Sequence, residues 1–150
     1  MKNLLTTTLC LAVAGLILTG CQTSSGTRGP IVIKPPHIDD LMEVASRATT
    51  ELLGHSSITE AKAKPVMEFA SIRNSTRARI QVEQVTGRIE DELVNSGRVK
   101  VVHPQDILSK PPDLYLDGLI MQQDATFTFQ LRLNDKGGRV WGRTIDIPAR

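Results

Sequence analysis

Aromatic residues are scarce in this chain of 150 residues, which has three Phe, one Tyr and one Trp. Stacking of bases or sugars on an aromatic platform therefore has little material to use. The sequence also lacks Gly-x-Ser-x-Gly, Walker, His-Glu-x-x-His and Cys-x-x-Cys motifs. Nothing in it predicts a catalytic site, a metal site or a cofactor, and we expect a protein that is not an enzyme.

Charge of one sign is not in large excess either. The chain has 18 Lys and Arg residues against 16 Asp and Glu residues, a net charge of +2. Such a balance gives no strong positive field for a polyanion. The sequence therefore predicts no nucleic-acid partner.

The first twenty residues have the layout of a secretory signal. Lys2 supplies the positive charge, and residues 4–18 are largely apolar and uncharged. This run is shorter than the about 20 residues that a transmembrane helix needs. It ends in Leu18-Thr19-Gly20-Cys21, which resembles the lipobox of bacterial lipoproteins. The resemblance implies cleavage between Gly20 and Cys21 and acyl chains, palmitate among them, on Cys21.

Acylation of Cys21 would make membrane lipid a partner of the mature chain, whereas the alternative is an ordinary thiol after a signal peptide. Several acyl chains give lasting attachment, because each buried methylene contributes about 0.8 kcal/mol. Cys10 would leave with the signal, so the mature chain would keep no free thiol. Gln22 is not the Asp that retains enterobacterial lipoproteins in the inner membrane. We therefore expect the outer membrane, on its periplasmic face.

Residues 21–36 predict a lipidated flexible tether, because they are mostly small and polar and end in two prolines. This leaves residues 37–150 for a single globular domain. The 15 residues from 22 to 36 span about 50 Å at most when extended and about 20 Å as a coil. The domain should therefore stay close to its membrane.

Helical spacing of apolar residues predicts a first helix that starts at Asp39 or Asp40 and ends near Gly54. If Asp40 is the cap, Glu43 completes a capping box. Residues 66–72 then predict an apolar strand.

A turn or helix entry follows at residues 73–76, and a second amphipathic helix extends from Val82 to residues 95–97. With a short strand at residues 99–102, these elements make a β-α-β unit.

Three further strands are expected at residues 114–121, 127–133 and 140–147, after a short helical turn at residues 103–108. Residues 134–138 predict a hairpin loop. The expected fold class is α/β (α+β), a small mixed sheet in which the β-α-β unit is followed by an antiparallel meander. The amino-terminal helix packs on this sheet.

Several segments resemble the LpoB-type outer-membrane lipoprotein activators of penicillin-binding proteins, whose fold is similar to that of the TolB amino-terminal domain. They are residues 66–69, Ser71-Ile72-Arg73-Asn74-Ser75-Thr76, Leu93-Val94-Asn95-Ser96-Gly97-Arg98, Phe129-Gln130-Leu131-Arg132-Leu133 and Gly138-Arg139-Val140-Trp141-Gly142. The likeness covers residues 37–147. It implies a non-enzymatic envelope lipoprotein that binds and activates a penicillin-binding protein in peptidoglycan synthesis. The alternative is a structural subunit of an outer-membrane export or flagellar-accessory assembly. A small-ligand binder would need an apolar pocket.

Arginines are the candidate contact residues for such a partner, because arginine is enriched at protein interfaces. Four of them gather in sequence around the predicted strand-to-helix turn, Arg88 being the farthest along the chain. The candidate partner interface is Arg73, Asn74, Thr76, Arg77 and Arg79. The alternative is a solvated loop with scattered charge. Trp141 is either a core residue, on the face of Ile145 and Ile147, or an interface anchor.

The three histidines, His37, His55 and His103, stand far apart at the ends of predicted elements. A metal site needs several ligands that converge, so we expect these to be loop or capping residues.

Overall fold

The computed structural model of this protein describes residues 34–148. The predicted signal peptide, Cys21 and residues 22–33 of the predicted tether lie outside the described residues. Along the chain the elements are α1 (Ile38–Leu53), α2 (Ser56–Thr59), β1 (Val66–Phe69), β2 (Arg73–Asn74), α3 (Val82–Ser96), β3 (Lys100–Val102), β4 (Leu114–Gln123), β5 (Thr126–Asp135) and β6 (Gly138–Ile147).

Helix α1 begins earlier than the sequence predicts. His37 is its N-cap, because the imidazole Nδ1 accepts the backbone N–H of Asp39 at 3.4 Å. Asp39 and Asp40 therefore lie inside the first turn, where a carboxylate interacts favourably with the helix dipole. The prediction that one of them caps the helix is wrong, and so is the capping box between Asp40 and Glu43. The predicted end of the helix, before Gly54, is confirmed.

Helix α3 confirms the second predicted helix. Its buried residues are Val85, Ile89 and Leu93, which recur at helical spacing and face the core. The helix stops at Gly97, whose φ of 64° is the left-handed conformation that glycine adopts without strain. Strand β3 then pairs in parallel with β1, so the predicted β-α-β unit is present.

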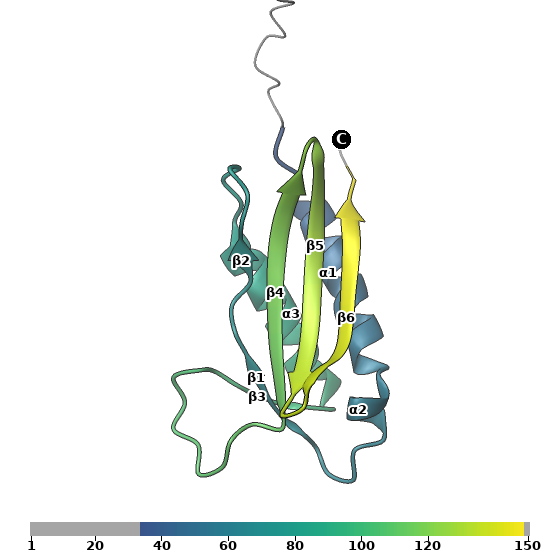
Figure 1. The fold of residues 1–150 in the computed structure, drawn as a ribbon, viewed down its shortest axis with the longest axis vertical. Coiled ribbons are helices and arrows are strands. Elements are labelled where there is room, and N and C mark those ends of the chain that lie inside the picture. Colours follow the sequence, from purple (N-terminus) through teal and green to yellow (C-terminus); the bar gives the residue numbers. More distant parts are fainter. Residues whose placement is uncertain (1–33, 149–150) are drawn as a thin grey trace, which may run out of the picture. The chain divides into compact units, whose positions relative to one another are not determined.

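The sheet has six strands, with the order β3-β1-β4-β5-β6 and with β2 paired to β4. Strands β1 and β2 run parallel to β4, whereas β4, β5 and β6 form an antiparallel meander. The predicted mixed sheet is therefore confirmed. Its strands β4, β5 and β6 stand side by side in Figure 1, with α1 and α3 behind them.

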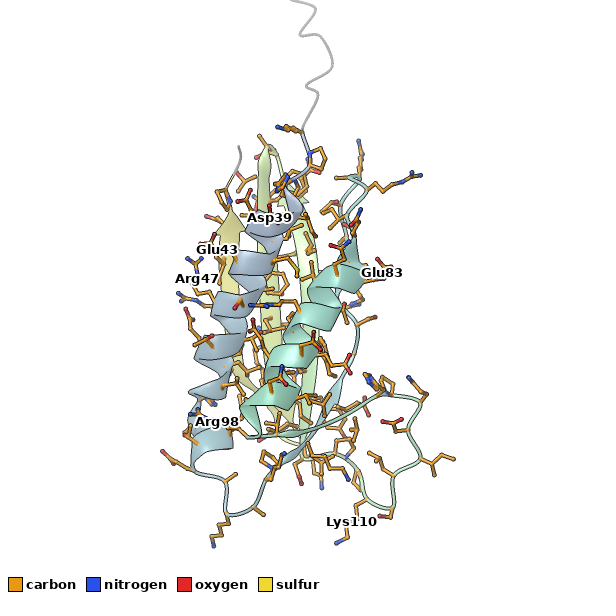
Figure 2. The ribbon with its side chains drawn as sticks, turned by 180° about the vertical axis from the view of Figure 1, so that it is seen from behind. Asp39, Glu43, Arg47, Glu83, Arg98 and Lys110 are labelled. Carbon is orange, nitrogen blue, oxygen red and sulfur yellow. The ribbon has the colours of Figure 1, made fainter. Side chains whose placement is uncertain are left out.

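Both long helices cover the same face of the sheet. Figure 2, seen from behind, shows α1 and α3 lying across this face. The core between the layers includes Leu41 and Leu52 of α1, Ile89 of α3, and Phe129 and Leu131 of β5, each at most 1% exposed. Burial of such apolar surface is the main force that holds the two layers together.

Three connections differ from the sequence prediction. The predicted strand at 66–72 stops at Phe69, and residues 73–74, predicted as a turn, form β2. The segment at 103–108 is no helical turn. The Asp106 carboxylate accepts a hydrogen bond from the His103 N–H at 2.7 Å, and the Asp106 N–H donates one to the His103 carbonyl oxygen. The hairpin loop contains only residues 136–137, because Asp135 and Gly138 already pair.

Candidate functional site

The candidate interface residues lie together in residues 73–79, which we call the arginine loop. The Asn74 side chain accepts the Thr76 backbone N–H at 2.9 Å and the Thr76 hydroxyl at 2.8 Å. Its own amide donates to the Ala78 carbonyl at 2.8 Å, and the Ala78 N–H donates to the Thr76 hydroxyl at 3.1 Å. The side chains of Asn74 and Thr76 therefore hold the conformation of the loop through local hydrogen bonds.

The three arginines of this loop are exposed. Arg73 lies in β2, and Arg77 and Arg79 follow in the loop. Arg79 also lines a hollow of about 440 Å³ together with Lys34 and His37, at the start of α1. The arginine loop therefore borders the point at which the chain enters the domain from its amino-terminal side.

Arg88 does not belong to this group, although the sequence places it close by. It sits on α3, where its Nε lies 2.7 Å from the carboxylate of Glu92, one helical turn later. It also lines a hollow with Glu43 and Arg47 of α1, so it borders the helix layer. Figure 2 shows Glu43 and Arg47 on α1, on the helix side of the molecule.

Ile72 fixes the position from which the arginine loop begins. Its side chain is buried, and its backbone N–H donates to the hydroxyl of Thr86 in α3 at 3.1 Å. The side chain passes over Gly118 of β4, at a distance that leaves no room for a Cβ there. Arg73, the next residue, is therefore held beside β4.

The histidines occupy the capping and loop positions that the sequence predicts. His55 caps α2 by accepting the Ser57 N–H at 3.3 Å, in the same way as His37 caps α1. His103 Nε2 lies 3.1 Å from a carboxylate oxygen of Glu90, which ties the segment after β3 to α3. Within residues 34–148, no group of three or more His, Cys, Asp or Glu residues is placed to hold a metal ion.

Trp141 shares the face of Ile145 and Ile147, as predicted, since all three lie opposite buried residues of β5. It packs against the core but is only partly buried. Of the two interpretations, the structure therefore supports a core residue at the margin of the sheet.

A second surface is the face of the sheet turned away from the helices, which we call the open face. Four side chains make one row across it, in pairs set by the strand register: Arg73, Leu119, Gln130 and Thr144. A second row holds Met121, Thr128 and Asp146. The strict alternation of residues 127–133 predicts this division, in which one face of the strand is buried and the other, with Thr128, Gln130 and Arg132, meets water.

A polar network lies next to these rows on the open face. Arg132 donates from its Nε to an Asp117 carboxylate oxygen at 2.9 Å, and a second guanidinium nitrogen contacts the same oxygen. The Asn134 amide donates to the other Asp117 oxygen at 3.2 Å. The two charges therefore satisfy each other across β4 and β5.

A family model described as "Peptidoglycan-synthase activator LpoB" matches residues 40–110. This span holds nearly all of α1, the whole arginine loop, α3 and β3. Over this span the chain is similar to LpoB-type proteins. The family is one of synthase activators rather than of enzymes. No curated protein matches the sequence.

Solved structures of LpoB show the same fold as this chain. The LpoB C-terminal domain from Escherichia coli matches with a TM-score of 0.57 at 17% identity, over 73% of this chain and 99% of that one. The corresponding domain from Salmonella enterica gives a TM-score of 0.50 at 15% identity, over 73% and 96%. The NMR structure of E. coli LpoB gives 0.52 at 16% identity, over 100% and 85%. The mixed sheet and its helices are therefore those of the LpoB C-terminal domain.

Among residues 34–148, no helix is both long and apolar enough to cross a membrane.

Proposed function

We propose that this LpoB-type chain is a non-enzymatic envelope lipoprotein that binds a penicillin-binding protein and activates its synthesis of peptidoglycan. The observation that carries the proposal is the match of residues 40–110 to the family of peptidoglycan-synthase activators. That match does not favour the alternative, a structural subunit of an export or flagellar-accessory assembly.

We also propose that the chain is cleaved between Gly20 and Cys21 and is then held on the periplasmic face of the outer membrane by acyl chains on Cys21. The lipobox-like tetrapeptide supports the anchor, and Gln22, which is not Asp, supports the outer membrane. From Cys21 to Lys34 the chain spans at most about 45 Å. The domain therefore begins within that distance of the membrane that anchors it, and a synthase partner must reach it there.

The arginine loop is the proposed contact for the synthase. Its arginines are exposed, and the loop that carries them is braced by four hydrogen bonds through Asn74 and Thr76. A pre-ordered loop binds with a smaller loss of conformational entropy than a disordered one. Guanidinium groups also make paired hydrogen bonds with carboxylates, so acidic side chains of the synthase are the expected partners.

The test is an activation assay with purified components. A bifunctional penicillin-binding protein from the same bacterium polymerises lipid-linked precursor in detergent, with and without the acylated full-length chain. We expect the glycan-polymerisation rate to rise when the chain is added, and no polymerisation by the chain alone. A rate that stays the same at saturating amounts of the chain, together with no binding, would contradict the proposal.

A further inference from the structure

The open face is a second candidate surface for binding a partner, because no other element of residues 34–148 lies in front of β4, β5 and β6 in Figure 1. Leu119 and Met121 lie side by side along β4 on this face, and both are partly buried rather than fully solvated. Arg73 pairs with Leu119 in the parallel ladder, so its side chain starts on the same face. The open face therefore continues directly into the arginine loop.

The charges on this face are those of a protein interface. On β2, β4, β5 and β6 its basic residues are arginines, and Lys100 shares the face at the β3 edge, two strands away from β4. Interfaces are enriched in Arg, Met and Tyr and depleted in Lys and Glu relative to the rest of the protein surface. Asp117 and Arg132, next to the row of Leu119 and Gln130, already form an ion pair. A highly charged partner surface would therefore gain little here, and a neutral one fits better.

The dimensions of the face also fit a protein. Strands β4, β5 and β6 have ten residues each. At about 3.3 Å per residue and about 4.8 Å between strands, the face measures roughly 33 by 14 Å, or about 450 Å² in projection. The arginine loop extends it towards the about 800 Å² that each partner contributes to an interface of standard size.

We propose that the open face, with Leu119, Met121 and Gln130 at its centre, is the surface on which the penicillin-binding protein docks. The partner surface is neutral and places an apolar side chain against Leu119 and Met121, while the arginine loop contacts carboxylates at the rim. This inference rests on the proposed function and names the contact that it requires.

Two substitutions probe the face without touching the core. Gln130→Lys introduces a charge into the row that also holds Leu119 and Thr144. This charge must lose its water if a neutral partner docks there. Gly142→Val adds bulk beside Arg139 and Arg132: the Cβ makes an ordinary contact at 3.6 Å with Cδ of Arg139, and this flexible side chain can move for the two additional methyl groups. The matched control is Gln84→Lys, the same exchange at an exposed position of α3, in the layer on the opposite face of the sheet.

The experiment measures the dissociation constant between the acylated full-length chain in detergent and a purified bifunctional penicillin-binding protein, at physiological salt. We expect Gln130→Lys and Gly142→Val each to weaken binding by about tenfold or more. Gln84→Lys should stay within about twofold, and all three variants should keep the melting temperature of the parent.

Each other outcome has a separate meaning. If the parent binds and the two face variants bind equally well, the docking surface is elsewhere, although the proposed function stands. If the parent itself does not bind the synthase, the proposed function fails, and this inference fails with it. If the parent is a dimer in light scattering and the face variants are monomers, the face joins two copies of this chain and the inference is wrong.

Discussion

Gly118 is the position at which one added methyl group should disturb the domain most directly. A Cβ at this position would lie 2.2 Å from Cδ1 of Ile72. Carbon atoms in contact are about 3.5–4.0 Å apart, so the Ile72 methyl must recede by about 1.5 Å in Gly118→Ala. Ile72 is 2% exposed, and the core around it offers little free space.

The cost follows from two opposing effects. Overpacking of a core costs about 1–3 kcal/mol, and the lower part of this range applies because only the end of one side chain must move. Alanine is favoured over glycine inside a strand by about 0.5–1 kcal/mol. We therefore expect Gly118→Ala to lower the free energy of unfolding by about 1 kcal/mol, or the melting temperature by about 4 °C.

A double-mutant cycle isolates the contact. Ile72→Val removes the clashing Cδ1 and alone costs about 0.5–1.5 kcal/mol. In the presence of Gly118→Ala, the substitution Ile72→Val should cost less. The free energy of unfolding of the double variant, measured in urea, should therefore be about 1 kcal/mol higher than the sum of the two single effects predicts. Gly87→Ala is the control, since nothing lies within 4 Å of the added Cβ, and it should stabilise α3 by about 1 kcal/mol. A coupling energy near zero would refute the packing explanation.

Three further outcomes are expected. Cys21→Ser should abolish metabolic labelling with palmitate, because no sulfur remains to be acylated, and undiminished label would rule out the anchor. A fragment of residues 37–150 should fold alone and turn over no peptidoglycan, since α1, α3 and the sheet share one core; measured turnover would contradict this. Joint replacement of Arg73, Arg77 and Arg79 by Ala should weaken synthase binding and leave the melting temperature within a few degrees, because exposed charges contribute about 0–1 kcal/mol each. A large loss of thermal stability would show that these residues serve the fold.

Much of this fold could be predicted from periodicity, and the failures have local causes. Helix α3 and the alternating strand β5 follow from apolar spacing, because each buries one face against a single layer. The cap of α1 was misplaced because a histidine ring nitrogen accepts the N–H that an aspartate usually takes.

The candidate site was predicted in part. The arginine loop lies where the sequence indicates. Arg88 lies apart from it, on the side of α3 where it contacts Glu92 and lines a hollow together with residues of α1. The open face was predicted only for residues 127–133, whose polar side chains alternate with buried apolar ones. Its continuation over Leu119 and Met121 of β4 follows from the strand pairing and from the position of both long helices on the other side of the sheet, which the pattern of one strand does not show.

The link between the arginine loop and the open face comes from one extra residue. Phe69 pairs with Leu116, and Arg73 pairs with Leu119, so this chain advances four residues while β4 advances three. Strict alternation from Phe69 would turn Arg73 towards the core and Ile72 towards solvent. The extra residue reverses both directions, like the additional residue of a β-bulge.

The buried Ile72 and the exposed Arg73 are therefore two results of the same irregularity. Ile72 needs the space above Gly118, and Arg73 needs the open face beside Leu119. In a continuous strand at residues 66–72, as the apolar run predicts, Ile72 would not be buried above Gly118 and Arg73 would not lie on the open face. Because a bulge re-aims a side chain at little cost to the rest of the sheet, the domain can present an arginine beside its apolar row and still keep a closed core.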